Sequence, residues 1–216
     1  MSPSDDGRTV LHYGVRRFPF GYVGILMKVL VIGGGAREHA LVWKLSSSPQ
    51  VTEIFTAPGN AGTALLGRNL DISAMDVEGL LAVAKSNKID LTLVGPETAL
   101  EVGVVDRFRA EGLTIAGPTQ TAARIETSKA FAKDLMMKYN IPTGKAELFT
   151  SYEDAMYYVQ RVAMPTVVKA DGLAAGKGVT VCQTCDEALL ALRVAMEDQV
   201  FGASGDRILV EECLFG

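Results

Sequence analysis

One glycine-rich segment has the composition expected of a phosphate-binding loop. Gly172–Gly178 reads GLAAGKG and contains Lys177, and Lys169 precedes it at the end of an apolar stretch. Backbone N–H groups and lysine ammonium groups are donors that suit phosphate oxygens, and a lysine on a buried strand needs an anionic partner. We therefore expect a hairpin that closes over nucleotide phosphates. A mobile surface hairpin without a ligand is the alternative.

The same segment differs from a P-loop at two positions. Asp171 stands where the P-loop pattern has its first glycine, and Gly178 stands where that pattern has serine or threonine. The residues that follow, Val179–Gln183, are typical of a strand, whereas a P-loop leads into a helix. The order strand, glycine-rich loop, strand therefore excludes the P-loop class.

Three further loops containing glycine follow predicted strands: Gly33–His39, Pro58–Thr63 and Gly95–Glu97. In an open parallel sheet the carboxyl ends of neighbouring strands border one crevice, and glycine lets backbone N–H groups approach an anion at a helix N-terminus. Arg37 would oppose the helix dipole unless it meets an anion. These features favour a site for a phosphorylated small molecule. A helix-capping turn without a ligand is the simpler alternative.

The first of these loops does not fit the dinucleotide-binding fingerprint. Glu38 occupies the position of the third glycine, and the following strand ends in Phe55–Ala57 without a carboxylate for the ribose. An NAD site is therefore disfavoured.

The elements that position the three loops alternate between strand and helix patterns after Met27. The predicted strands are Lys28–Gly33, Val51–Ala57, Ile89–Gly95 and Leu113–Ala116, and the predicted helices are Arg37–Ser47, Val77–Ser86 and Val102–Ala110. Asp76 is placed to cap the second helix. Strands separated by helices of about ten residues indicate βαβ units and a parallel sheet.

The pattern changes after residue 126. We expect helices at Ser128–Tyr139, from Ser151 onward and at Asp186–Val200, and strands at Glu147–Thr150, Pro165–Ala170, Val179–Gln183 and Arg207–Glu212. The glycine-rich hairpin joins two of these strands. The second part is therefore an α+β unit rather than a continuation of the parallel sheet.

Composition and charge restrict the class of protein. The 216 residues are 48% hydrophobic, which is typical of a chain that forms a core, and the net charge of −4 argues against a dedicated nucleic-acid binder. The apolar stretches are too short for a membrane helix. Three cysteines without an export signal indicate a reducing cytoplasm. The lone Cys182–Cys185 pair lacks the further ligands of a zinc site, so we interpret it as structural.

Residues 1–26 differ from the rest of the chain. They contain no clear period of 2 or 3.6, and glycine and proline interrupt them repeatedly. The strand pattern begins abruptly at Met27. We interpret Met27 as a natural start, and residues 1–26 as a disordered leader or a misassigned extension.

These motifs together resemble the N-terminal half of the phosphoribosylamine–glycine ligase (glycinamide ribonucleotide synthetase) family of ATP-grasp enzymes. The resemblance extends over nearly all of residues 27–216. It rests on the runs Val29–Leu41, Ala57–Thr63, Val94–Glu97, Gly117–Thr119, Ser128–Phe131, Ile141–Thr143, Val168–Gly178, Phe201–Gly202 and Val210–Glu212. Two departures are Ala36, where the family often has glycine, and Ala99, where it usually has proline.

The resemblance implies a fold and a domain division. The fold class would be α/β, with a Rossmann-like parallel-sheet N-terminal (pre-ATP-grasp) domain at residues 27–126 followed by an incomplete ATP-grasp domain. Residues 127–148 would begin the ATP-grasp core, residues 149–210 would form its α+β lid subdomain, and residues 211–216 would be the adenine hinge.

The resemblance also implies a reaction, namely ATP-dependent ligation of glycine to 5-phosphoribosylamine in purine biosynthesis. The partners would be these small molecules, without nucleic acid or membrane, and the complete enzyme would be a cytoplasmic monomer. The ATP site would comprise Lys129, Lys169, Gly172, Leu173, Ala174, Ala175, Gly176, Lys177, Gly178, Glu211, Glu212, Cys213 and Leu214. The phosphoribosylamine site would comprise Gly33, Gly35, Arg37, Glu38, His39, Gly59, Asn60, Ala61, Gly62, Thr63, Gly95, Pro96 and Glu97.

The complete enzyme would also need Mg or Mn. In the family, the magnesium ligands lie beyond the position of Gly216, so we expect no metal site in this chain and little or no activity from the chain alone. The catalytic residues stay unassigned. Two other functions remain open: a non-catalytic ATP or ribose-phosphate binding module, and another ATP-grasp purine enzyme.

Overall fold

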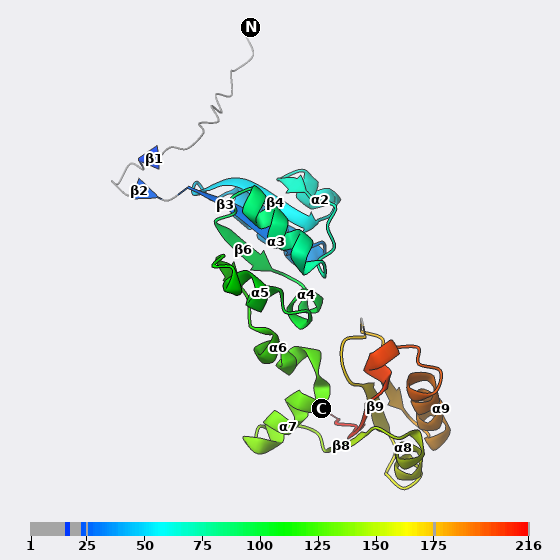
Figure 1. Cartoon of the computed structure of the whole chain (residues 1–216). Coiled ribbons are helices and arrows are strands. Elements are labelled where there is room, and N and C mark those ends of the chain that lie inside the picture. The colour runs from blue at the N-terminus through cyan, green and yellow to red at the C-terminus, as the bar shows by residue number, and fades with distance from the viewer. Residues whose placement is uncertain (1–15, 18–22, 25, 175, 216) are drawn as a thin grey trace. The chain divides into compact units, whose positions relative to one another are not determined.

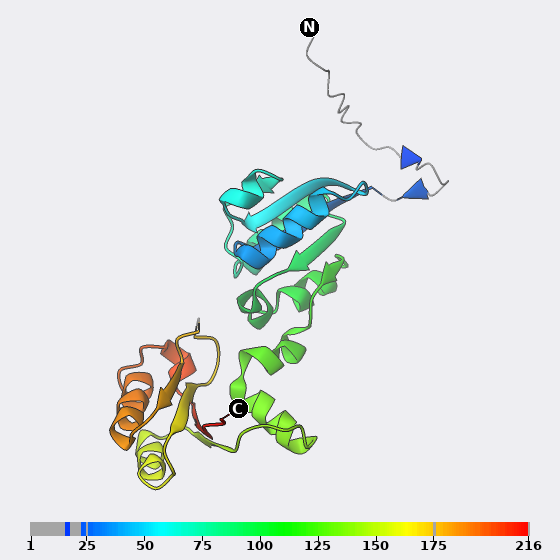
Figure 2. The ribbon, with the colours of Figure 1, turned by 180° about the vertical axis from the view of Figure 1, so that it is seen from behind.

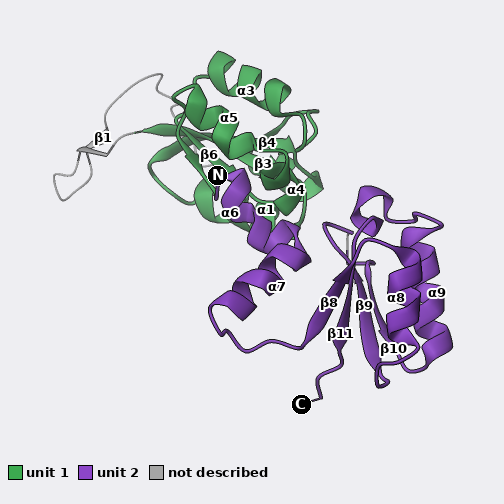
Figure 3. Cartoon of the chain, turned by 60° about the horizontal axis from the view of Figure 1, so that its bottom comes forward, with its two compact units in different colours: residues 1–117 green, residues 118–216 purple. Residues whose placement is uncertain are grey.

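The computed structural model describes residues 16–17, 23–24, 26–174 and 176–215. The chain forms two compact units, Met1–Gly117 and Pro118–Gly216 (Figure 3). Most of the expected leader lies outside the described residues. Within it, β1 (Arg16–Arg17) and β2 (Val23–Gly24) pair as a short antiparallel ladder. Among the described residues, no helix is both long enough and apolar enough to cross a bilayer.

Unit 1 is built around a five-stranded parallel sheet (Figure 1). Its strands are β3 (Met27–Gly33), β4 (Val51–Pro58), β5 (Arg68–Asn69), β6 (Leu91–Val94) and β7 (Ile115–Ala116), in the order β5-β4-β3-β6-β7. The chain first adds strands on one side of β3 and then crosses to the other side. Such a reversal opens a crevice at the carboxyl ends of the strands.

Helices cover both faces of this sheet (Figure 1; Figure 2). α3 (Val77–Ser86) and α5 (Val104–Ala110) lie on one face, and α1 (Ala36–Ser46) lies on the other. Successive side chains of a strand point to opposite faces. Leu30 accordingly packs in one core cluster with Leu80 of α3, whereas Val31 packs in another with Val42 of α1.

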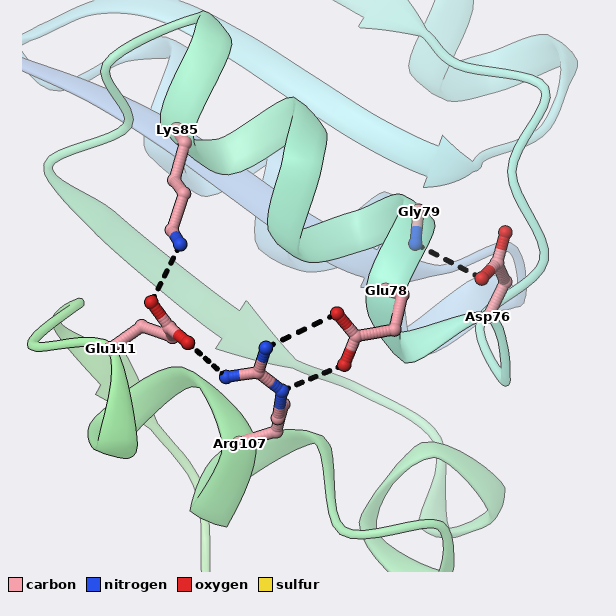
Figure 4. A network of polar contacts seen from close by, with 6 residues as sticks. All are labelled: Asp76, Glu78, Gly79, Lys85, Arg107 and Glu111. Atoms are coloured by element: carbon pink, nitrogen blue, oxygen red, sulfur yellow. Dashed lines mark hydrogen bonds and ion pairs between the residues drawn. The ribbon is translucent and has the colours of Figure 1, made fainter.

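An ionic network joins α3 to the end of α5 (Figure 4). Arg107 Nε lies 2.7 Å from Glu78 Oε1, and Arg107 also pairs with Glu111. Lys85 Nζ lies 2.6 Å from the Glu111 carboxylate. The hydrogen bond from Lys85 and then that from Arg107 lower the pKa of Glu111 to about 2. The network is exposed to solvent, so salt weakens it.

Unit 2 contains a four-stranded antiparallel sheet in the order β10-β9-β11-β8. Its strands are β8 (Ala146–Phe149), β9 (Thr166–Ala170), β10 (Val179–Cys182) and β11 (Ile208–Glu212). α8 (Tyr152–Val159) and α9 (Cys185–Met196) lie on one face (Figure 3). Val168, Ala170, Ile208 and Val210 pack in the core with these helices. The alternate residues of β9 and β11, including Lys169 and Glu211, therefore lie on the opposite face.

The expected α/β class and the parallel sheet of the N-terminal unit are confirmed, and the structure adds that the strands of unit 2 pair antiparallel. Besides β1 and β2, the structure adds five elements that sequence patterns did not predict: α2 (Ala61–Ala64), α4 (Glu97–Glu101), α6 (Gln120–Thr127), the 3-10 turn η1 (Gly202–Gly205) and β5. The helix expected at Val102–Ala110 begins later because Gly103, with φ of 80°, separates α4 from α5. The expected helix Asp186–Val200 ends at Met196 instead. α7 (Lys129–Lys138) follows the prediction closely.

Candidate functional site

A cavity of about 590 Å³ lies at the carboxyl ends of β3, β4 and β6 in unit 1. This position is the point of strand-order reversal, where open α/β sheets bind ligands. The cavity is lined by Gly33, Gly34, Gly35, Ala36, Arg37, Glu38, Pro58, Ser73, Ala74, Met75, Pro96, Glu97 and Thr98. The structure thus brings the first and third predicted loops to one site, together with Pro58 from the second.

Glu38 is the buried carboxylate of this site, and three glycines make room for it. Its side chain accepts a 2.6 Å hydrogen bond from Gly35 N–H, and the residue is only 4% exposed. A Cβ on Gly95 would lie 2.0 Å from Glu38 Oε1, and a Cβ on Gly33 would lie 2.6 Å from Glu38 Cγ. Positions 33 and 95 therefore require glycine, because the Glu38 side chain occupies the space that a Cβ atom would need.

Arg37 joins the first loop to the third. Its guanidinium donates a 2.6 Å hydrogen bond to Gly95 O and lies 3.6 Å from a carboxylate oxygen of Glu97. Glu97 is the anion that offsets the unfavourable position of Arg37 at a helix N-terminus. The Arg37 side chain is 66% exposed, so the guanidinium is accessible to an anionic ligand as well.

After Pro58, the residues of the second predicted loop brace the site rather than line it. Asn60 Nδ2 donates hydrogen bonds to Gly34 O at 3.0 Å and to Gly35 O at 3.2 Å, and Asn60 also caps α2. A Cβ on Gly62 would lie 2.3 Å from His39 Cε1, so the imidazole packs against that glycine. The residues His39, Gly59, Asn60, Ala61, Gly62, Thr63 and Gly95 are thus close to the cavity but are not among its lining residues.

The wall formed by Ser73–Met75 was not predicted from the sequence. These residues lie between β5 and α3, immediately before the capping residue Asp76. They contain no glycine loop or charged side chain that would have drawn attention. The strand before them, β5, was not predicted either, so the sequence offered no signal for this wall.

In unit 2, a buried aspartate ties the start of α7 to the base of the predicted hairpin. Asp171 is 3% exposed, and its carboxylate accepts hydrogen bonds from Ala130 N at 3.0 Å and Ser128 Oγ at 3.2 Å. Arg207 lies 2.5 Å from the same carboxylate. These bonds hold α7 beside the hairpin, where Lys129 Nζ donates a 2.7 Å hydrogen bond to Gly172 O.

The environment of Lys129 disfavours its charged form. Burial is the largest cause of a lowered pKa, and repulsion from Lys169 acts in the same direction, while Asp171 opposes it. A lysine whose positive charge is incompletely compensated gains free energy when an anion binds beside it.

The glycine-rich hairpin between β9 and β10 is anchored at its base and exposed near its end. Ser204 Oγ donates a hydrogen bond to Leu173 O at 3.0 Å, and a Cβ on Gly172 (φ 98°) would lie 2.8 Å from the same hydroxyl. Lys177 is exposed. Ala174, Gly176 and Gly178 complete the described hairpin, and Ala175 lies outside the described residues.

Lys169 and Glu211 form an ion pair on the sheet face opposite α8 and α9. Lys169 Nζ lies 2.7 Å from Glu211 Oε2. Burial alone would raise the pKa of the Glu211 carboxyl, but hydrogen bonds from Lys169 and Lys133 outweigh it and keep that pKa below its ordinary value. Lys169 was expected to need an anionic partner. In the structure that partner is the Glu211 carboxylate.

The remaining predicted ATP residues follow on β11 and after it. Glu212 accepts a 2.8 Å hydrogen bond from Lys145 N, while Leu214 is 68% exposed and Cys213 half-buried. The sequence-based prediction missed Ser128, Lys133, Asp171 and Arg207. The i, i+4 spacing of Lys129 and Lys133 was the signal for Lys133, because that spacing places both lysines on one face of α7.

Comparisons with known proteins agree across both units. The family model described as "Phosphoribosylglycinamide synthetase, N domain" matches residues 27–126, and that family's "ATP-grasp (A) domain" matches residues 127–216. Phosphoribosylamine–glycine ligase of Yersinia pestis is 54% identical over 192 residues, and that of Pasteurella multocida is 53% identical. Each match covers 88% of this chain and 45% of the relative, so the chain spans about half the length of these curated relatives.

Solved structures agree as well. Phosphoribosylamine–glycine ligase of Thermotoga maritima matches with a TM-score of 0.70 and 29% identity, covering 88% of this chain and 44% of that one. Carboxyaminoimidazole ribonucleotide synthase of Aspergillus clavatus, solved in complex with ATP, matches with a TM-score of 0.65 and 19% identity. The match covers 88% of this chain and 48% of that one, and at this identity it shows a similarity of fold alone. The family models match both units, and the sequence is more than half identical to the ligases above. The chain therefore belongs to the phosphoribosylglycinamide synthetase family.

Proposed function

We propose that the chain is part of an ATP-dependent ligase that joins glycine to 5-phosphoribosylamine and releases glycinamide ribonucleotide, ADP and phosphate. The proposal rests on the presence of two candidate sites, one in each unit, in one member of this family. Unit 1 has a cavity at the strand-order reversal, and unit 2 has Lys129 at the start of α7 and Lys169 on β9, near a glycine-rich hairpin. Each site has the chemistry that one substrate of this reaction requires.

In the proposed reaction, a carboxylate oxygen of glycine attacks the γ-phosphorus of ATP, and ADP leaves. The amine of phosphoribosylamine then attacks the carbonyl carbon of the glycyl phosphate, and inorganic phosphate leaves. Both steps redistribute negative charge over phosphate oxygens, so fixed positive groups stabilise them. Lys129 and Lys169 supply that charge in this proposal, and the hairpin Gly172–Gly178 closes over the phosphates.

The cavity of unit 1 is the proposed phosphoribosylamine site. The backbone N–H groups at the start of α1 and the accessible guanidinium of Arg37 are donors for a phosphate. Glu97 and Ser73 also line the cavity and offer acceptors and a hydroxyl for a ribose. The bracing of the first loop by Asn60 keeps this arrangement formed before a ligand arrives.

The resemblance implies a divalent metal for the complete enzyme. Among the described residues, no three His, Cys, Asp or Glu side chains are grouped so that they could hold a metal ion. We therefore assign no metal ligand and no metal-dependent step to these residues.

The proposal is tested by titrating the purified full chain with ATP and, separately, with ribose 5-phosphate by calorimetry. Arg37→Ala should weaken the binding of ribose 5-phosphate about tenfold, the effect of a lost charge-assisted hydrogen bond, without changing ATP affinity. Lys169→Gln should do the reverse. Lys44→Ala, on an exposed position of α1, is the matched control for Arg37.

A direct assay completes the test. ADP release that requires both glycine and 5-phosphoribosylamine would demonstrate the ligase reaction in this chain. If the wild-type chain bound neither ATP nor ribose 5-phosphate, the proposed assignment of the two sites would be wrong.

A further inference from the structure

The Glu211 carboxylate is held between two lysines whose surroundings differ. Lys133 Nζ lies 3.1 Å from Glu211 Oε1, and Lys169 Nζ lies 2.7 Å from Glu211 Oε2. The side chain of Lys133 is 7% exposed, whereas that of Lys169 is 26% exposed. We call these three residues the Glu211 cluster. Two ammonium groups and one carboxylate give the cluster one net positive charge.

Lys133 is fully engaged within the protein. Its ammonium group donates to Thr143 Oγ1 at 2.6 Å and to Gly144 O at 2.8 Å, in addition to its contact with Glu211. An ammonium group has three N–H donors, and these three acceptors use all of them. Lys133 is thus fixed and has no donor left for a ligand.

Lys169 is engaged differently. Among the described residues, Glu211 is the one acceptor within hydrogen-bond distance of its ammonium group. Two of its three donors are therefore not used by the described residues, and its side chain is 26% exposed. Lys169 can exchange or share its contact with Glu211 when an anion arrives, whereas Lys133 cannot.

The backbone also reserves space for this arrangement. A Cβ on Gly144 would lie 2.9 Å from Glu211 Oε1 and 3.3 Å from Glu211 Cγ. Glycine at this position lets the carboxylate come close enough to the segment after α7 to reach Lys133. The position of the Glu211 carboxylate is thus set by both Lys133 and Gly144.

We propose that Lys133 is a positioning residue for polyphosphate binding: it holds and neutralises Glu211 so that the positive charge of Lys169 remains available to the ligand. The inference rests on the proposed function and deepens it, since it assigns a role to a residue that does not touch ATP. Without Lys133, Lys169 and Glu211 would form a neutral pair, and the carboxylate would compete with phosphate for the Lys169 ammonium group. The loss of one unit of local positive charge weakens attraction to a polyanion.

The test uses charge balance in the full chain. Lys133→Gln keeps a hydrogen-bond donor for Thr143 and Gly144 but removes the charge, and should weaken ATP binding on the order of tenfold in calorimetry. Adding Glu211→Gln to Lys133→Gln restores the net charge of the cluster to one, and should raise the affinity at least about threefold above that of Lys133→Gln. Lys133→Arg keeps the charge and should therefore lose less ATP affinity than Lys133→Gln. Lys138→Gln, on an exposed position of α7, is the matched control.

A purely structural role for Lys133 predicts a different result. In that case the double variant would bind ATP as weakly as Lys133→Gln or more weakly, because a second change in a damaged site does not repair it. That outcome, or unchanged ATP binding by Lys133→Gln, would overturn the inference. Thermal unfolding of each variant verifies that it is folded at the assay temperature.

A measurement without ATP separates this inference from the proposed function. Carbon-13 NMR titration of the Glu211 carboxyl should give a pKa below its ordinary value in the wild-type chain and a higher one in Lys133→Gln, because a hydrogen bond that favours the carboxylate is lost. An unchanged pKa would overturn the inference even if ATP binds. If the wild-type chain bound no ATP, the proposed function would fail, and this titration alone would decide whether Lys133 controls Glu211.

Discussion

The ammonium group of Lys129 donates a 2.7 Å hydrogen bond to the carbonyl oxygen of Gly172, 43 residues further along the chain. Lys129 is the first residue of α7, and Gly172 begins the glycine-rich hairpin. The bond therefore connects a helix terminus to a loop that closes over phosphates in the proposed function. In the proposed function a bound phosphate would accept a hydrogen bond from the same ammonium group, so Lys129 would contact both the hairpin and the ligand.

Substitution Lys129→Met should loosen the hairpin. A hydrogen bond from a charged donor stabilises a folded state by about 1.5–3 kcal/mol, so amide hydrogen exchange in residues 172–178 should become at least about tenfold faster. Mass spectrometry of peptides covering this segment measures the rate. Lys138→Met on the same helix is the control and should leave exchange unchanged. Equal rates in both variants would show that the Lys129–Gly172 bond does not restrain the hairpin.

Substitution Asp171→Asn should destabilise unit 2. The buried carboxylate accepts hydrogen bonds from Ser128 Oγ and Ala130 N and pairs with Arg207. The neutral amide loses the charge-assisted part of these contacts, and the free energy of unfolding should fall by about 1–3 kcal/mol. Urea denaturation measures the change. Asp134→Asn, at an exposed position of α7, should change stability by less than about 0.5 kcal/mol. Equal effects would contradict the assigned role of Asp171.

Substitution Gly95→Ala should disturb the cavity of unit 1 through Glu38. The added methyl group would lie 2.0 Å from Glu38 Oε1, and such overpacking costs about 1–3 kcal/mol. In a Glu38→Ala background the collision is absent, so the same substitution should cost clearly less. A double-mutant cycle with unfolding free energies provides the comparison. Additive effects of the two substitutions would mean that Gly95 is needed for another reason.

The ionic network of Glu111 predicts a pH dependence. The pKa of Glu111 is lowered from 4.5 to about 2, so the folded state favours the carboxylate. Its contribution to stability is present above pH 4.5 and is lost as the pH falls through about 2. The stability difference between wild type and Glu111→Gln should therefore shrink between pH 4.5 and pH 2, and 1 M NaCl should reduce it at all pH values. Urea unfolding at several pH values tests this, and a difference that stays constant down to pH 2 would exclude the network as its source.

Local sequence was sufficient to predict most helices and strands and the loops after β3 and β6 that line the cavity of unit 1. The helix Val77–Ser86 and its capping residue Asp76 were predicted with the observed bounds, because a carboxylate before an amphipathic run specifies a helix start through contacts only three residues apart. The glycine loops after β3 and β6 were found for a similar reason. Glycine is found there because the backbone turns tightly at the end of a strand.

Long-range packing determined the features that the sequence did not reveal. Ser73–Met75 form a cavity wall only because β5 brings them to the edge of the sheet where the glycine loops lie. Lys133 reads as an ordinary helix lysine, and its burial against Glu211 depends on β11 lying next to β8 and β9. Residue types and short spacings indicate contacts that form within one helical turn or at the end of one strand. Pairing between groups tens of residues apart depends on sheet order and register, which the folded chain alone supplies.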